Sequence, residues 1–366
     1  MNKNYLLIAV LMSIGMMTSC SSSDTEENTP VGNPAVVSLE LNGKAMTRSA
    51  ASTDEANISG GQAAAFDASG AIVGTVQSFL TSEAATPTIN TTTQATQVSV
   101  VANPGTTSTS KFTGIVNKKN LEDVTTDLAS TTTAATTPNS QDAKLLPKYG
   151  NATLTFGTDS KANPTVDMYN LVGKIKLSSI KTNFLGTGYA GATFVPKEVF
   201  LYNANTTCTF GGTGSAPQTG ENTSKDGNYS ISPNDFCYLS SGVIASYNED
   251  SPTAYTFYTF PNDATTPTKI VIKGAFTPKD GSPVVVYYPI VVNRYQGGTT
   301  ITKDGKPIDK ADVNDSKIVQ STSYDVSIII KGKGMDSPDS NITPATATIT
   351  MNVKNWTDYT QEVTVE

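Results

Sequence analysis

The chain has 366 residues, of which 37% are hydrophobic and only 16% charged; it carries a net charge of −7 and contains no histidine. An acidic balance gives no basic surface for a nucleic acid, and the lack of histidine excludes Ser-His and Cys-His nucleophile pairs and imidazole metal sites. Thr, Ser, Asn and Gly take the place of charged residues, which is typical of a β-rich extracellular protein. No phosphate-binding or nucleophile-elbow motif occurs, so we expect no enzymatic activity, no cofactor and no metal ion.

Residues 1–20 are predicted to be a lipoprotein signal peptide. Lys3 precedes an apolar run at 5–12, and Met17-Thr18-Ser19 lead directly to Cys20. A signal peptide has this order of charged start, apolar core and small residues, and the apolar run is too short to span a bilayer. Small residues before a cysteine that a polar run follows resemble a bacterial lipobox, in which Cys20 is lipidated. The alternative is an ordinary signal peptide with an incidental cysteine.

Residues 21–48 combine a polar tether with a short strand. Apolar side chains alternate with polar ones and predict a strand with one buried face, formed by Val37, Leu39 and Leu41. Residues 44–59 are small and polar, so we expect an exposed linker there, of the kind that proteases cut. This linker contains Arg48 and Ser49.

The rest of the chain is expected to be all-β. Apolar runs of strand length recur between turn-rich stretches, which is the pattern of a β-sandwich. They lie at 71–76, 98–101, 154–156, 171–177, 197–202, 255–260, 269–272, 284–292, 324–330 and 347–353. One stretch differs, because Leu121, Val124 and Leu128 have the spacing of a helix face and predict a single short helix.

A weak internal repeat predicts two tandem sandwiches. The strands at 36–41 and 62–66 have counterparts at 171–177 and 195–202. With a boundary near residue 165, the predicted segments are the signal peptide (1–20), the tether and first strand (21–48), an N-terminal sandwich (49–164) and a C-terminal sandwich (165–366).

Two cysteines remain if Cys20 is lipidated. Cys208 and Cys237 could form a disulfide in an oxidising compartment. Their spacing does not show whether they come close enough to bond, so this pairing stays open.

The C-terminus carries an apolar pattern almost to its last residue, whereas chain ends are usually polar. Such a one-faced strand either packs on its own sheet or is offered to a partner as an added strand, and composition favours packing on its own sheet. The residues of this pattern are Ala347, Ile349, Met351, Val353, Trp356, Tyr359, Val363 and Val365.

Arginine is rare, since the chain has only Arg48 and Arg294. Arg294 follows the predicted strand 284–292, which should shield it, so an arginine-specific protease would find one open bond, after Arg48. A cut there would free the first strand and leave a groove of apolar surface and unpaired backbone groups. The alternative is that Arg48 is an ordinary solvated linker residue.

Several runs resemble the fimbrillin family, and in particular the FimA-type major subunits of type V fimbriae. Their order along the chain carries the resemblance, which extends from the lipobox to the last strand. Ahead of the strand at 324, residues 321–323 replace the histidine and arginine that are usual in the family. The matching runs are 193–199, 287–293, 324–328, Lys331-Gly332-Lys333-Gly334, Pro338, Ile342-Thr343 and Trp356.

This resemblance implies two transthyretin-like β-sandwich domains and a precursor anchored in the outer membrane through lipidated Cys20. It also implies that an arginine-specific protease cuts between Arg48 and Ser49, and that mature subunits polymerise by strand exchange on the cell surface, with residues 347–365 as donor. The implied partners are other copies of the chain, fimbrial tip and anchor subunits, and the protease. Two alternatives remain: a monomeric surface lipoprotein that binds glycan or host protein, and a tip or anchor subunit.

Overall fold

The computed structural model describes residues 32–43, 53–80, 86–104, 109–127, 141–205, 207–212, 239–262, 265–295, 299–303, 305–308 and 316–355. The chain from Gly32 onward belongs to one compact unit. The described residues do not include the predicted signal peptide with Cys20, the predicted cleavage point Arg48–Ser49, Cys237, or Trp356 and the residues after it.

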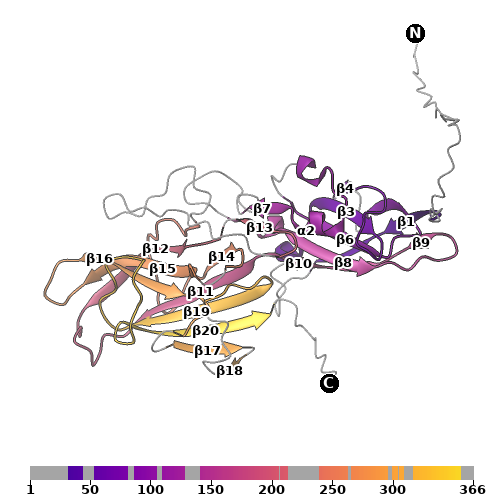
Figure 1. Cartoon of the computed structure of the whole chain (residues 1–366). Helices are drawn as coiled ribbons and strands as arrows, with labels where there is room; N and C mark the ends of the chain where they lie inside the picture. The colour runs from indigo at the N-terminus through magenta and orange to yellow at the C-terminus, as the bar shows by residue number, and fades with distance from the viewer. Residues whose placement is uncertain are drawn as a thin grey trace, which may run out of the picture. The chain divides into compact units, whose positions relative to one another are not determined.

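Two sheets form the first half, residues 32–170 (Figure 1). The larger sheet has the strand order β2-β10-β8-β6-β3-β4 and the smaller one β5-β1-β9. The strands are β1 (Pro34–Ser38), β2 (Glu40–Gly43), β3 (Gly60–Phe66), β4 (Gln77–Leu80), β5 (Thr88–Thr92), β6 (Gln97–Ala102), β8 (Lys148–Thr153), β9 (Lys161–Ala162) and β10 (Thr165–Asn170).

The second half also contains two sheets, with the strand orders β14-β11-β19-β20-β17-β18 and β12-β15-β16 (Figure 1). A separate pair, β7 (Thr125–Asp127) and β13 (Thr207–Thr209), links the halves. The second-half strands are β11 (Gly173–Thr182), β12 (Thr193–Tyr202), β14 (Tyr255–Thr259), β15 (Lys269–Thr277), β16 (Val284–Val291), β17 (Thr299–Lys303), β18 (Lys306–Pro307), β19 (Thr322–Ile330) and β20 (Ala347–Asn355).

Helical structure is short. The elements are α1 (Thr53–Ala56), α2 (Lys118–Glu122) and the 3-10 turns η2 (Thr109–Phe112) and η4 (Ala143–Leu145). The all-β prediction is therefore confirmed.

The strands form where apolar and polar residues alternate, because successive side chains of a strand point to opposite faces. In β11, Ile175 and Leu177 are buried, while Lys174 and Lys176 are half-buried on the other face.

The predicted helix is shorter than the sequence pattern suggested. Asn117 caps α2, because its Oδ1 accepts a hydrogen bond from Asn120 N at 2.8 Å. The helix ends at Glu122, since residues 125–127 pair with β13 instead. Strand pairing with β13 thus overrides the helical spacing of Leu121 and Val124. Leu128 lies outside the described residues.

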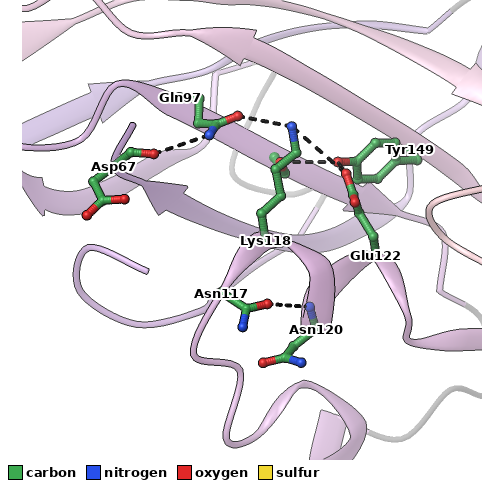
Figure 2. Close-up of polar contacts among 8 residues, drawn as sticks. Asp67, Gln97, Asn117, Lys118, Asn120, Glu122 and Tyr149 are labelled. Carbon is green, nitrogen blue, oxygen red and sulfur yellow. Dashed lines mark hydrogen bonds and ion pairs between the residues drawn. The ribbon is translucent and has the colours of Figure 1, made fainter. Parts of the chain in front are cut away.

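Lys118 is more than a solvated residue at the start of a helix. Its Nζ donates to Gln97 Oε1 at 3.0 Å and lies 3.9 Å from Glu122 Oε1 (Figure 2). Glu122 in turn accepts a hydrogen bond from Tyr149 OH at 2.7 Å. Burial raises the pKa of Tyr149, so the phenol remains a donor. This network fastens α2 onto β6 and β8.

The boundary between two sandwiches stays a prediction. β10 pairs in parallel with β2 and antiparallel with β8, so residues 165–170 belong to the first-half sheet by their hydrogen bonds. β11, which begins at Gly173, pairs with β14 and β19. The chain therefore changes sheet between Asn170 and Gly173.

Candidate functional site

The first strand lies inside its sheet. β1 pairs antiparallel with β5, from Pro34↔Thr92 to Ser38↔Thr88, and in parallel with β9 through Val36 and Val37. β2 continues the same segment and pairs in parallel with β10. We call the place of β1 between β5 and β9, with that of β2 beside β10, the acceptor slot. Removing residues 34–43 would expose pairing groups on three strands.

The side chains of this segment are core residues. Val37 and Leu39 are 0% exposed, and Ala35 is 5% exposed. Leu41 is half-buried, whereas Val36 points outward and is 37% exposed. Val37 and Leu39 belong to a hydrophobic cluster of the first half, and Leu41 packs against it; the cluster includes Ile89, Val98, Val166 and Met168. The alternation in the sequence therefore corresponds to one buried face.

The end of β2 contacts α1, which follows the predicted cleavage point. A Cβ on Gly43 would lie 2.0 Å from the carbonyl oxygen of Ala56, so only glycine allows the end of β2 to approach α1 this closely. Residues 44–52 therefore connect two points that are already in contact. A cut after Arg48 would sever the covalent connection between β2 and α1 without removing their contact.

α1 is anchored by a buried carboxylate, so the expectation of an exposed linker through residue 59 is wrong at Glu55. Glu55 is 2% exposed. Its Oε1 accepts hydrogen bonds from Lys174 Nζ and from Tyr258 OH, both at 2.6 Å. Burial, with the Glu55 carboxylate beside it, raises the pKa of Tyr258, so the phenol stays protonated and donates. α1 is thus held to β11 and β14.

Asn103 holds the same segment from the other side. Its side-chain Oδ1 accepts from Ser59 N at 2.7 Å, and its Nδ2 donates to the carbonyl oxygens of Asn57 (2.9 Å) and Leu146 (3.0 Å). Asn103 adopts φ +50°, a left-handed conformation that asparagine tolerates better than most residues. These bonds fix the chain between α1 and β3.

Nothing in the sequence around Glu55 points to this anchor. Lys174 and Tyr258 lie 119 and 203 residues away along the chain. Burial of an acidic residue within a small polar stretch depends on such distant partners, and no local pattern reveals them.

β20 is an interior strand of the second-half sheet. It pairs antiparallel with β19 along its whole length and in parallel with β17. The alternating residues Ala347, Ile349 and Met351 are 0% exposed and Val353 is 8% exposed. These four residues of the expected donor segment therefore pack on their own sheet, and a donor role for them would require β20 to leave both neighbours. Trp356, Tyr359, Val363 and Val365 lie outside the described residues.

Arg294 and Cys208 are both sheltered. Arg294 is half-buried and follows a turn in which Asn293 adopts φ +55°. Burial raises the pKa of the Cys208 thiol to about 12, which keeps it protonated at neutral pH. Because Cys237 lies outside the described residues, its pairing with Cys208 stays a prediction.

Two absences concern the part of the chain that the structure describes. No group of three His, Cys, Asp or Glu side chains there could hold a metal ion. No helix there is long and apolar enough to cross a membrane.

The fold resembles solved structures at low sequence identity. A candidate cell adhesion protein from Bacteroides eggerthii has a TM-score of 0.63 at 22% identity, covering 90% of this chain and 99% of that one. Another candidate cell adhesion protein, from Parabacteroides distasonis, has a TM-score of 0.58 at 16% identity, covering 90% of this chain and 100% of that one. A fimbrilin (FimA) from Porphyromonas gingivalis has a TM-score of 0.57 at 18% identity, covering 90% of this chain and 99% of that one.

No protein-family model and no curated protein sequence matches the chain. The likeness therefore lies in the three-dimensional structure, and it extends over nearly the whole of each relative. The resemblance to fimbrillins that the sequence predicted is confirmed for the fold: this chain has the all-β fold of the fimbrilins.

Proposed function

We propose that this protein is the structural subunit of a cell-surface fimbria that supports adhesion, and that it assembles by strand exchange after a cut at Arg48. One observation carries the proposal: an interior strand of the first-half sheet is supplied by a segment that one cut separates from the rest of the fold. The fold shared with a fimbrilin and with candidate cell adhesion proteins supports the same role.

Before the cut, the chain fills its own acceptor slot. Withdrawing Val37, Leu39 and Leu41 would expose apolar side chains that each contribute about 1.5 to 3 kcal/mol when buried. It would also free the backbone groups of β5, β9 and β10 that now pair with this segment. A vacated slot therefore favours binding of a replacement strand, and the uncut precursor stays monomeric.

After the cut, the two sides of the bond behave differently. The upstream peptide is held by strand pairing, by apolar contacts and by the exposed side-chain hydrogen bonds Asn42–Asp167 and Glu40–Thr165. The downstream segment remains bound through Glu55 to Lys174 and Tyr258. The slot can thus be vacated while the body of the subunit keeps its N-terminal segment in place.

The replacement strand comes from the C-terminus of another copy. Because β20 pairs with β19 up to Asn355 and with β17 up to Val353, the donor is the segment from Trp356 to Glu366. Tyr359, Val363 and Val365 in it keep the odd-numbered alternation. Strand addition would take its affinity from backbone hydrogen bonds and its register from these side chains. A subunit that both accepts and donates a strand fits a shaft better than a tip or an anchor.

Subunits isolated from assembled fimbriae are expected to begin at Ser49. Intact-mass measurement and N-terminal sequencing check this directly. As a control, the Arg48→Ala variant should appear only as an unprocessed, lipid-bearing chain that starts at Cys20. Assembled material in which every subunit keeps that lipid-bearing start would overturn the proposal and favour an anchored monomer that binds its ligand on the surface.

A further inference from the structure

In the part of the chain that the structure describes, strands cover one edge of the larger second-half sheet incompletely. β14 is the outermost strand, and within the described residues it pairs with Gly173–Leu177 of β11 only. The edge therefore has two parts: the outer side of β14, and β11 from Ser178 to Thr182. Backbone N–H and C=O groups on such an edge are a template for a strand of another chain.

Side chains close the β11 part of this edge. Ile180 N donates to Tyr247 OH at 2.7 Å, and Thr182 N donates to Glu249 Oε2 at 2.9 Å. Thr182 Oγ1 also donates to Glu249 Oε1 at 2.8 Å. The N–H of Asn183, the next residue, points to the opposite side of the strand and donates to Ile330 O of β19. The Ile180 and Thr182 N–H groups therefore point outward, where an added strand would bind.

A side-chain amide closes the β14 part. Gln141 Oε1 accepts from Tyr258 N at 2.7 Å, and Gln141 Nε2 donates to Tyr258 O at 2.8 Å. These are the two bonds that a residue of a neighbouring strand would make. Two positions further on, Phe260 forms a bridge with Asn205. Gln141 thus takes the place of a strand residue.

The edge of the smaller sheet is closed in a related way. Met335 exchanges two backbone hydrogen bonds of 2.8 Å with Tyr287 of the outermost strand β16. Pro289, two residues along the same strand, has no N–H to offer. Closure of exposed edges by groups other than long strands is therefore repeated in this half.

We propose that Gln141, Tyr247 and Glu249 prevent a second copy of this chain from adding to the β14–β11 edge. The edge is the same in every copy, so two uncapped edges would be self-complementary as an antiparallel pair related by a twofold axis. The capping itself does not depend on cleavage at Arg48. That strand addition between copies is then directed to the acceptor slot rests on the proposed function.

The test uses a chain without residues 1–20 that carries Arg48→Ala, so that the acceptor slot stays filled. The triple variant Gln141→Ala, Tyr247→Phe, Glu249→Ala is compared with this parent by analytical ultracentrifugation. We expect the triple variant to self-associate with a dissociation constant lower by about tenfold or more. Hydrogen exchange at the amides of Ile180, Thr182 and Tyr258 should be slow in the parent and faster in the diluted triple variant.

Two controls separate capping from general damage. Asn248→Ala lies on the same loop and removes only a local bond to Asp250 N, so it should leave the chain monomeric. Glu249→Gln keeps an acceptor oxygen for Thr182 N and should also remain monomeric.

A folded triple variant that associates no more than its parent would overturn the proposal. Association of the Asn248→Ala control as tight as that of the triple variant would overturn it too. If the triple variant does not fold, Tyr247→Phe alone decides, since it keeps the ring: at least about twofold tighter association is expected, and no change refutes the proposal.

Discussion

Replacing Glu55 by alanine is expected to lower the free energy of unfolding by about 3 to 5 kcal/mol, because it breaks a buried ion pair from one side. Lys174, whose side chain is 17% exposed, would lose its carboxylate partner at 2.6 Å. Tyr258 OH would lose its acceptor at the same time. Urea unfolding of the parent and the Glu55→Ala variant measures the loss.

Asp54→Ala is the matched control for this prediction, since Asp54 is the preceding residue of α1. Asp54 pairs with Lys144 at 3.7 Å, and both side chains are more than half exposed. Such a surface pair contributes at most about 1 kcal/mol. Equal stability losses for Asp54→Ala and Glu55→Ala would show that burial of Glu55 does not anchor the segment after the cleavage point.

Replacing Lys148 by methionine is expected to stabilise the protein below about pH 7 and to lose this benefit at higher pH. Lys148 is 0% exposed, and its Nζ donates to Leu146 O at 3.2 Å. Burial lowers the pKa of Lys148 from 10.5 to about 7, while Glu55 acts in the opposite direction. The folded state therefore disfavours the ammonium form.

The sign of the pH dependence follows from this lowered pKa. Below about pH 7 both the folded and the unfolded chain carry the proton, and the folded state bears the full cost, on the order of 5 kcal/mol. Between about pH 7 and 10.5 the unfolded chain still binds the proton and the folded chain does not, so stability rises with pH. Unfolding measurements at about pH 6 and pH 10 should show a large gain for Lys148→Met only at the lower pH.

Lys279→Met controls for the loss of a lysine at an exposed position. It should change the stability little and equally at both pH values. A Lys148→Met variant that is less stable than the parent at about pH 6 would mean that the buried ammonium is well compensated, against this account.

The sequence predicted those parts of the fold in which neighbouring residues alternate. The buried face of β1 and the buried face of β20 both follow from a period of two, because successive strand residues point to opposite sides of a sheet. The same pattern left open what each strand pairs with. It did not show that β1 lies between β5 and β9, or that β20 lies between β19 and β17, because pairing joins residues far apart in the chain.

The parts that sequence reasoning missed are those that depend on distant partners. Residues 53–56 are polar and small, yet Glu55 is buried because β11 and β14 supply its donors. The spacing that predicted a helix through Leu128 was overridden because β13 pairs with residues 125–127. Gln141, Tyr247 and Glu249 likewise have no sequence signature, since each caps backbone groups of another element.

A mixing experiment tests strand exchange most directly. One chain without residues 1–20 carries Arg48→Ala, so its slot is closed while its C-terminal segment is intact. A second chain lacks residues 357–366 and has been cut after Arg48, so its slot can open while it has no complete donor.

Neither chain should polymerise alone. The account predicts that together they form a dimer of one copy of each and nothing longer, as measured by mass determination in solution. If the mixture stays monomeric while the cut full-length chain polymerises, or if either chain forms fibres alone, the acceptor slot and the C-terminal segment are not the two halves of the assembly contact.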